Sequence, residues 1–282
     1  FYIHQLHLNH NGASGAEETK ILSLSNTYDI NRGVTTPEQT NNIIEEYIKR
    51  KNSNKDFAEF YCIDPPYERF KKSDGEYWKV GEYVNGGVST FTAGELAKAA
   101  FQNGYEEYGW DILCRIRNMI VSDGEVHFLY DPKTGENMSG GPSGWGSAAI
   151  IDAIDAGLAG IVDGDVCYKV LDFSPRWAVT GINEVRYITG YESSKRLIQT
   201  DFFMNDNSMI YQISCPSHLV NCHILLPKGK ICNKVFIDNI NVQFAVSKVK
   251  ESTYIDFEFE KEDIELNVWT KLRRYTIRIF FE

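Results

Sequence analysis

The chain has 282 residues, 43% of them hydrophobic and 13% aromatic, a composition typical of a folded globular protein with one large domain or two ordinary ones. No stretch approaches the roughly 20 apolar residues that a membrane-spanning helix needs. The 39 acidic and 29 basic residues give a net charge of -10, whereas nucleic-acid binding needs clustered Lys and Arg side chains. We therefore expect neither a membrane nor a nucleic acid as the main partner.

The first helical signal begins at Thr36. Thr36 is a suitable N-cap, Pro37 suits the first helical position and Gln39 completes a capping box. Apolar residues then recur at helical spacing, and basic residues at 49–51 favour the last turn, where cations meet the negative end of the helix dipole. A further helix is expected before residue 35.

Two more helices follow in close succession. Thr92 and Glu95 form the pattern of a capping box, and Asn103-Gly104 is a typical C-terminal signal. The next apolar face repeats at Tyr108, Ile112 and Ile116. The short link between them predicts an antiparallel helical hairpin.

A fourth helix is predicted from about Gly146 to Ile161. Its many alanines and glycines let backbones approach closely, which favours a helix packed inside a bundle. From about residue 165 the pattern changes to short β-branched and aromatic runs separated by polar turns, as in a β-sandwich. The runs are 185–188, 210–213, 223–226, 235–237, 241–246, 254–259 and 275–280. The sequence therefore predicts a helical domain over 1–164 and a β-domain over 165–282.

The six cysteines include no CxxC pair, so a zinc ribbon is not indicated. We interpret them mostly as buried thiols in a reducing compartment, which favours the cytoplasm, although a disulfide among Cys215, Cys222 and Cys232 is an alternative. No basic-then-apolar leader is visible at the start.

Three segments carry a resemblance to a known family. The first is Tyr77–Val88, which contains Asn85-Gly86-Gly87 and leads directly into a helix; the second is the Gly- and Ser-rich turn 139–149 around Trp145; the third is 171–177 with 181–185. Their order and spacing resemble those of the six-hairpin (α/α toroid) glycosidases and sugar phosphorylases. Such enzymes often have Trp-Pro after the first segment, where this chain has Ser89-Thr90.

The resemblance implies an α+β fold in which helical hairpins of an α/α toroid precede an antiparallel β-sandwich. A full toroid has twelve helices, and at roughly 11–12 residues each plus loops they do not fit into residues 1–160. We therefore expect the second half of a toroid. An incomplete helical ring leaves apolar surface uncovered, so we also expect a homo-oligomer or substitute packing.

The same resemblance points to a sugar site around the first two segments. Glycoside cleavage needs two carboxyl groups, and Glu82 is the candidate acid/base residue; the alternative is a solvated loop carboxylate. Aromatic rings would stack on sugar faces, although aromatics are more often core residues, and the glycines would admit the ligand, although a tight turn explains them nearly as well. The candidate substrate-binding residues are Trp78, Tyr83, Asn85, Gly86, Gly87 and Trp145.

Other polar residues have simpler explanations. Asp64 precedes a Pro-Pro turn and fits a turn-forming role, and Glu95 is explained by its capping position. His4, His7 and His10 share one face if helical, but Asn and Gly weaken that helix and no carboxylate or Cys completes a metal site. We therefore expect no metal and no cofactor.

The leading hypothesis is a glycoside hydrolase-like protein that acts on oligosaccharides or polysaccharides by carboxylate acid/base chemistry. The alternative is a non-catalytic carbohydrate-binding or interaction protein derived from the same fold. A third, plainer reading is a structural fragment with no ligand.

Overall fold

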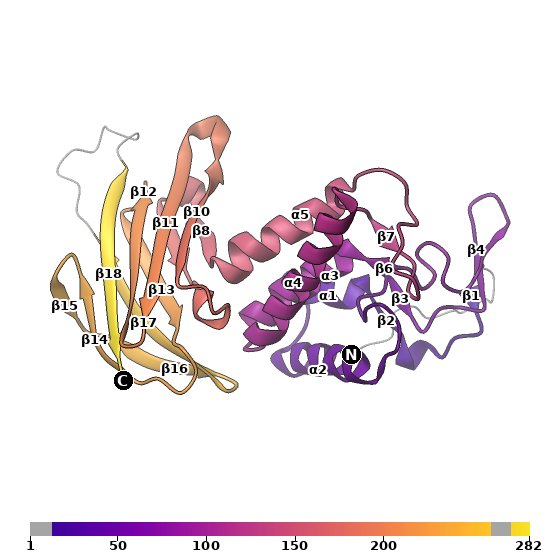
Figure 1. The fold of residues 1–282 in the computed structure, drawn as a ribbon, viewed down its shortest axis with the longest axis horizontal. Helices are drawn as coiled ribbons and strands as arrows, with labels where there is room; N and C mark the ends of the chain where they lie inside the picture. The colour runs from indigo at the N-terminus through magenta and orange to yellow at the C-terminus, as the bar shows by residue number, and fades with distance from the viewer. Residues whose placement is uncertain (1–12, 261–271) are drawn as a thin grey trace. The chain divides into compact units, whose positions relative to one another are not determined.

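The computed structural model of the chain describes residues 13–260 and 272–282 (Figure 1). His4, His7 and His10 lie outside these residues. Helices and sheets coexist, as the predicted α+β class requires. The chain divides into two compact units, Phe1–Asn103 with Tyr108–Ala153 and Gly104–Glu107 with Ile154–Glu282. The domain limits 1–164 and 165–282 stay a prediction.

The first unit contains the predicted early helices. α1 spans Leu24–Asn31. α2 spans Pro37–Ser53, and the capping box between Thr36 and Gln39 is present as predicted. Ile43, Ile44 and Tyr47 of α2 are buried, so its apolar stripe faces the core of this unit.

α3 spans Thr90–Gln102 and begins two residues earlier than predicted. Its N-cap is Ser89, whose hydroxyl oxygen accepts hydrogen bonds from the amides of Phe91 at 3.2 Å and Thr92 at 3.5 Å. The capping box expected for Thr92 and Glu95 is therefore wrong, because Thr92 already lies inside the first turn.

Glu95 instead joins a partly buried polar cluster within the first unit. Its carboxylate lies 3.2 Å from a guanidinium nitrogen of Arg32, and the Asn31 amide donates to the same oxygen at 2.5 Å. Only 4% of Glu95 is exposed, and a carboxylate buried to this extent is tolerated only when it is paired and hydrogen-bonded.

The last two described α-helices are α4, Glu106–Asp123, which belongs to the first unit from Tyr108 onward, and α5, Gly144–Asp152. The predicted apolar face of α4 is buried at Tyr108, Ile112 and Ile116. The small residues bring α3 and α5 together as expected, because a Cβ on Gly94 would lie 2.5 Å from the backbone of Ala149. None of the helices in the described part of the chain is long and apolar enough to cross a membrane.

The prediction of a helix as far as Ile161 is wrong at its end. A π-helical turn follows α5 over Ala153–Leu158, and a strand already begins at Ile161. Gly160 has a φ of +62°, and a Cβ there would clash with the Ser174 carbonyl at 1.8 Å. This glycine permits the turn that separates helix from strand.

The second unit consists mainly of two sheets (Figure 1). The six-stranded sheet has the order β10-β11-β12-β18-β14-β15 and is antiparallel throughout. Its strands are β10 Glu184–Tyr191, β11 Arg196–Asn205, β12 Ser208–Cys215, β18 Arg273–Phe281, β14 Cys232–Ile237 and β15 Ile240–Val242. The sequence-based strand list lacks β11, although Ile198, Thr200 and Phe202 are buried in period two.

The five-stranded sheet has the order β16-β17-β13-β9-β8. Its strands are β16 Ala245–Val249, β17 Ser252–Glu260, β13 Leu219–Leu225, β9 Val170–Phe173 and β8 Ile161–Asp165. β9 and β13 pair in parallel, so the predicted purely antiparallel arrangement is wrong at this pair. The predicted strand 241–246 is divided between β15 and β16, which belong to different sheets.

Aromatic side chains fill the space between the two sheets. Phe173 of β9 contacts Tyr211 of β12 edge to face, with ring centroids 5.4 Å apart, and Phe259 of β17 contacts Tyr275 of β18 at 4.8 Å. All six cysteines are free thiols. The alternative of a disulfide among Cys215, Cys222 and Cys232 is therefore wrong in this structure.

Short paired strands connect the loops that surround the helices of the first unit. β1 Ala13–Ser14, β4 Arg69–Lys71 and β5 Tyr77–Trp78 form one small sheet. β2 Leu22–Ser23 pairs with β3 Ile63–Asp64, and β6 Val88–Ser89 pairs with β7 Leu129–Tyr130. The β6–β7 pair brings the segment that contains Asn85-Gly86-Gly87 beside the segment between α4 and α5.

Candidate functional site

The loop after β5 is a compact structure closed by its own backbone. The Glu82 amide donates to the Lys79 carbonyl at 3.0 Å, the Asn85 amide to the Glu82 carbonyl at 3.0 Å, and the Gly81 amide to the Asn85 carbonyl at 2.8 Å. These bonds fix the course of the backbone between Lys79 and Asn85. We call residues 79–87 the glycine loop.

Asn85 holds the glycine loop to the chain before it. Its side-chain oxygen accepts from the Tyr67 amide at 2.8 Å, and its side-chain nitrogen donates to the Tyr67 carbonyl at 2.8 Å. The residue is completely buried. Its amide is thus engaged in positioning the loop.

Two glycines of the loop, Gly86 and Gly87, are each required for a different steric reason. Gly86 has a φ of +103°, a conformation that side chains rarely adopt. Gly87 donates its amide to the Tyr83 carbonyl at 2.9 Å, and a Cβ on it would lie only 2.3 Å from that oxygen. Both glycines therefore serve the tight turn.

Glu82 is the candidate acid/base residue and lies on the surface of the glycine loop. One carboxylate oxygen accepts from the Lys79 amide at 2.8 Å. The other lies 3.8 Å from the ammonium of Lys72, and 40% of the Glu82 side chain is exposed. The carboxylate is therefore anchored at one oxygen and accessible to solvent.

The structure brings the three predicted aromatic residues into one contact chain. Trp78 stacks on Tyr83 with centroids 4.7 Å apart, Tyr83 meets Phe128 edge to face at 6.2 Å, and Phe128 meets Trp145 edge to face at 6.0 Å. We call Trp78, Tyr83, Phe128 and Trp145 the aromatic strip. Trp145 is 70% exposed and Tyr83 38%, so these rings are available to a ligand.

Three separate segments position the aromatic strip. Trp78 ends β5 and Tyr83 lies in the glycine loop with a φ of +52°. Trp145 lies in the first turn of α5, whose N-cap Ser143 accepts from the Gly146 amide at 3.0 Å. Phe128 precedes β7, and its amide donates to the Ser139 hydroxyl at 3.1 Å.

Phe128 is the strip residue that sequence reasoning missed. It lies between α4 and α5 in a segment with no recognisable motif, and it joins the strip only through contacts with residues distant in sequence. The local signal that it offers is its place just before the strand that pairs with Val88-Ser89.

Asp64 and the possible metal ligands are the other polar residues considered in the sequence. Asp64 forms an ion pair with Arg50 at 2.6 Å. Within residues 13–260 and 272–282, no group of three or more His, Cys, Asp or Glu side chains is arranged to hold a metal ion.

Comparisons with known proteins place the fold but no family. No family model matches the sequence, and no curated protein matches it either. Among solved structures, an α-L-rhamnosidase from Dictyoglumus thermophilum matches with a TM-score of 0.54 at 11% identity, over 92% of this chain and 25% of that chain. The chain thus spans about a quarter of the length of that rhamnosidase.

Two further solved structures match with a TM-score of 0.31, too low to carry an argument. They are a GH127 β-L-arabinofuranosidase from Geobacillus Stearothermophilus T6, at 11% identity over 75% of this chain and 35% of that chain, and a Streptomyces avermitilis α-L-rhamnosidase complexed with L-rhamnose, at 9% identity over 89% and 25%. The first match gives this chain a glycosidase-like fold.

Proposed function

We propose that this chain is the sugar-binding part of a glycoside hydrolase-like protein and binds oligosaccharides along the aromatic strip. The observation that carries the proposal is the continuous contact of Trp78, Tyr83, Phe128 and Trp145, with Trp145 70% exposed. Sugar rings have apolar faces that pack on aromatic rings, and a row of rings suits a chain of sugars better than a single one.

The glycine loop contributes to this function by positioning Tyr83. Gly86, Gly87 and the side chain of Asn85 fix the backbone of the loop, and that backbone fixes Tyr83. In this proposal Asn85 and the glycines contribute to sugar binding by positioning the ring of Tyr83.

Glu82 is the acid/base candidate within the same proposal. It lies beside Tyr83 in the glycine loop, and 40% of its side chain is exposed. Glycoside cleavage uses two carboxyl groups at a defined separation, and Glu82 is the one that we assign. Hydrolysis therefore requires a second carboxyl group in addition to that of Glu82, whereas sugar binding does not.

The finer architecture belongs to the same proposal. We infer the last hairpins of an α/α toroid in the helical unit and a β-sandwich in the two sheets, supported by the fold shared with the Dictyoglumus rhamnosidase. Large apolar residues are exposed on α4 and α5, at Val121 (70%) and Ile151 (55%). A second copy of the chain that covers them would give a homo-oligomer, which a mass measurement in solution tests.

The binding function is tested by calorimetric titration with cellohexaose, maltohexaose and rhamnogalacturonan fragments. Replacing Trp145 by Ala removes a stacking surface, and we expect the affinity for the bound sugar to fall by about five- to thirtyfold, which corresponds to about 1–2 kcal/mol. Tyr28→Ala is the control, because Tyr28 is 39% exposed and is not part of the strip.

Catalysis is tested separately. Wild type and Glu82→Gln are compared for release of reducing sugar from the same oligosaccharides. Turnover by the wild type that Glu82→Gln abolishes supports the acid/base assignment. Binding without turnover supports the binding function alone, and the absence of both in the wild type contradicts the proposal.

A further inference from the structure

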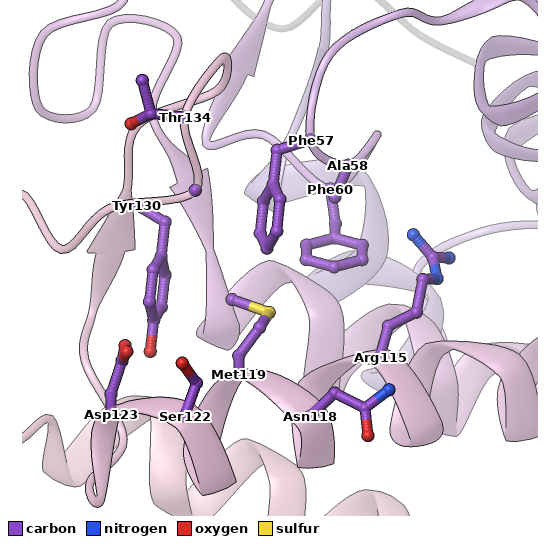
Figure 2. A pocket seen from close by; sticks show the side chains of 11 residues that line it. Phe57, Ala58, Phe60, Arg115, Asn118, Met119, Ser122, Asp123, Tyr130 and Thr134 are labelled. Atoms are coloured by element: carbon purple, nitrogen blue, oxygen red, sulfur yellow. The ribbon is translucent and has the colours of Figure 1, made fainter.

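A cavity of about 400 Å³ lies in the helical unit between the C-terminal half of α4 and two loops, and no strip residue lines it (Figure 2). Its volume is near the lower end of the range of about 300–1,000 Å³ that small-molecule sites occupy. The residues that line it are Phe57, Ala58, Phe60, Arg115, Asn118, Met119, Ser122, Asp123, Tyr130, Thr134 and Gly135. A ligand of one or two rings fits this space.

Aromatic rings form one wall of the cavity. Phe57 and Tyr130 have their ring centroids 6.4 Å apart, with planes inclined by 30°. Phe60 and Tyr130 are fully buried, whereas Phe57 is 39% exposed. Phe57 therefore offers exposed apolar surface next to two buried rings.

Polar groups of α4 form the opposite wall. Arg115, Asn118 and Ser122 are three and four residues apart, so they share one side of the helix, and Asp123 lines the same cavity at the end of α4. Figure 2 shows Ser122 and Asp123 pointing from α4 toward Tyr130, and Met119 rising between them and Phe60. Hydrogen-bonding groups thus face an apolar platform across the cavity.

Asp123 is unusual for its place in the helix. It is the last residue of α4, and the last turn contains no basic residue, so the carboxylate faces the negative end of the helix dipole. Burial raises the pKa of Tyr130 to about 12, and the nearby charge of Asp123 acts in the same direction. The His127 ring lies 3.8 Å from the carboxylate. The carboxylate therefore costs helix stability while it is aimed at the cavity.

The charges around the cavity disfavour an anionic ligand. Arg115 donates two hydrogen bonds to Glu59, both at 2.8 Å, and lies 2.9 Å from Asp111, so its positive charge is already compensated. It is the one cation among the residues that line the cavity, which disfavours an anionic ligand.

We propose that this cavity is a second carbohydrate site that binds a single neutral pyranose ring, with the apolar face of the sugar on Phe57. Sugar hydroxyls donate to the Asp123 carboxylate and accept from Asn118 and Ser122. The site is separate from the aromatic strip, and its occupation does not depend on sugar binding there.

The test is an NMR titration of the full chain with the methyl pyranosides of D-glucose, D-galactose and L-rhamnose, each added separately, with sorbitol as an acyclic polyol control. We expect the backbone amides of Ser122, Asp123 and Gly135 to shift with at least one pyranoside and not with sorbitol.

Matched variants locate the binding. Phe57→Ala and Asp123→Asn each raise the Kd about tenfold or more, the effect of losing an apolar platform or a charged hydrogen-bond acceptor. Val121→Ala, on the same helix and 70% exposed, leaves it unchanged. Trp145→Ala also leaves it unchanged, which separates this site from the strip.

Two results overturn the proposal. One is the absence of shifts at these amides with all three pyranosides, or equal shifts with sorbitol. The other is binding that Phe57→Ala and Asp123→Asn leave intact. Loss of oligosaccharide binding in Trp145→Ala concerns the strip alone, so each of the two proposed sites can be contradicted without contradicting the other.

Discussion

The indole ring of Trp78 stacks on the phenol ring of Tyr83, with centroids 4.7 Å apart and planes inclined by 29°. Trp78 immediately precedes the glycine loop, and Tyr83 lies within it. Tyr83 reaches this position through a left-handed backbone conformation with a φ of +52°. The stack therefore depends on the geometry of the glycine loop as much as on the two rings.

Replacing Gly87 by Ala should disrupt this geometry. The added Cβ would lie 2.3 Å from the Tyr83 carbonyl oxygen, so the loop must shift, and we expect a loss of roughly 1–3 kcal/mol in the free energy of unfolding. Gly141→Ala is the control, since nothing lies within 4 Å of its Cβ position. Urea unfolding compares the two; equal stability of both variants would show that the close contact has no energetic weight.

Asn85→Ala should leave the amide and carbonyl of Tyr67 without their side-chain partner. Each buried polar group without a partner costs about 1–3 kcal/mol, so thermal unfolding should occur at a clearly lower temperature. Asn241→Ala, at an exposed position in β15, should have little effect. A drop of the same size in both variants would contradict the anchoring role of Asn85.

Ser89→Ala should destabilise the protein by about 0.5–2 kcal/mol, the usual cost of removing an N-cap. Thr92→Val should cost less, because the helix already begins at Thr90 and Ser89 caps it. Denaturation midpoints of the two variants decide between the observed cap and the cap predicted from sequence. A larger loss of stability in Thr92→Val than in Ser89→Ala would favour Thr92 as the N-cap.

Alkaline pH should weaken the fold through Cys62. Burial raises the pKa of its thiol from 9.0 to about 11, so the folded state disfavours the thiolate. This contribution is complete below pH 9 and is lost as the pH rises toward about 11; it amounts to roughly 2–3 kcal/mol.

Cys62→Ala separates the contribution of this thiol to the pH dependence of stability from the contributions of the other buried thiols and phenols. The variant should lose less stability than the wild type between about pH 8 and about pH 11 in urea titrations. Identical pH dependence of the wild type and Cys62→Ala would contradict the assignment.

The sequence is most informative where the signal is local. The capping box of Thr36 and Gln39 and the apolar faces of α2 and α4 follow from residues a few positions apart, and the structure confirms them. Ser89 and Thr92 both offer a hydroxyl near the start of α3. The choice between them depends on the β6–β7 pairing and on the burial of Glu95 against Arg32, which lies 63 positions away in the chain.

The candidate site shows the same division. The Gly-rich segments direct attention to Trp78, Tyr83 and Trp145, and the structure brings these residues together. Phe128, which connects two of them, and the cavity lined by Phe57 and Asp123 arise from segments with no motif. Only the folded arrangement reveals them, because their contacts join loops far apart in sequence.

Sugar binding on the aromatic strip is tested most directly by the indole N–H signals of an isotope-labelled sample. Trp145 is 70% exposed in the strip, whereas Trp177 is 6% exposed in the other unit and serves as an internal reference. On titration with the oligosaccharides named above, the Trp145 signal should shift and saturate while that of Trp177 stays in place. A Trp145 signal that stays unchanged with every oligosaccharide, or while one of them binds elsewhere, would contradict the proposed function.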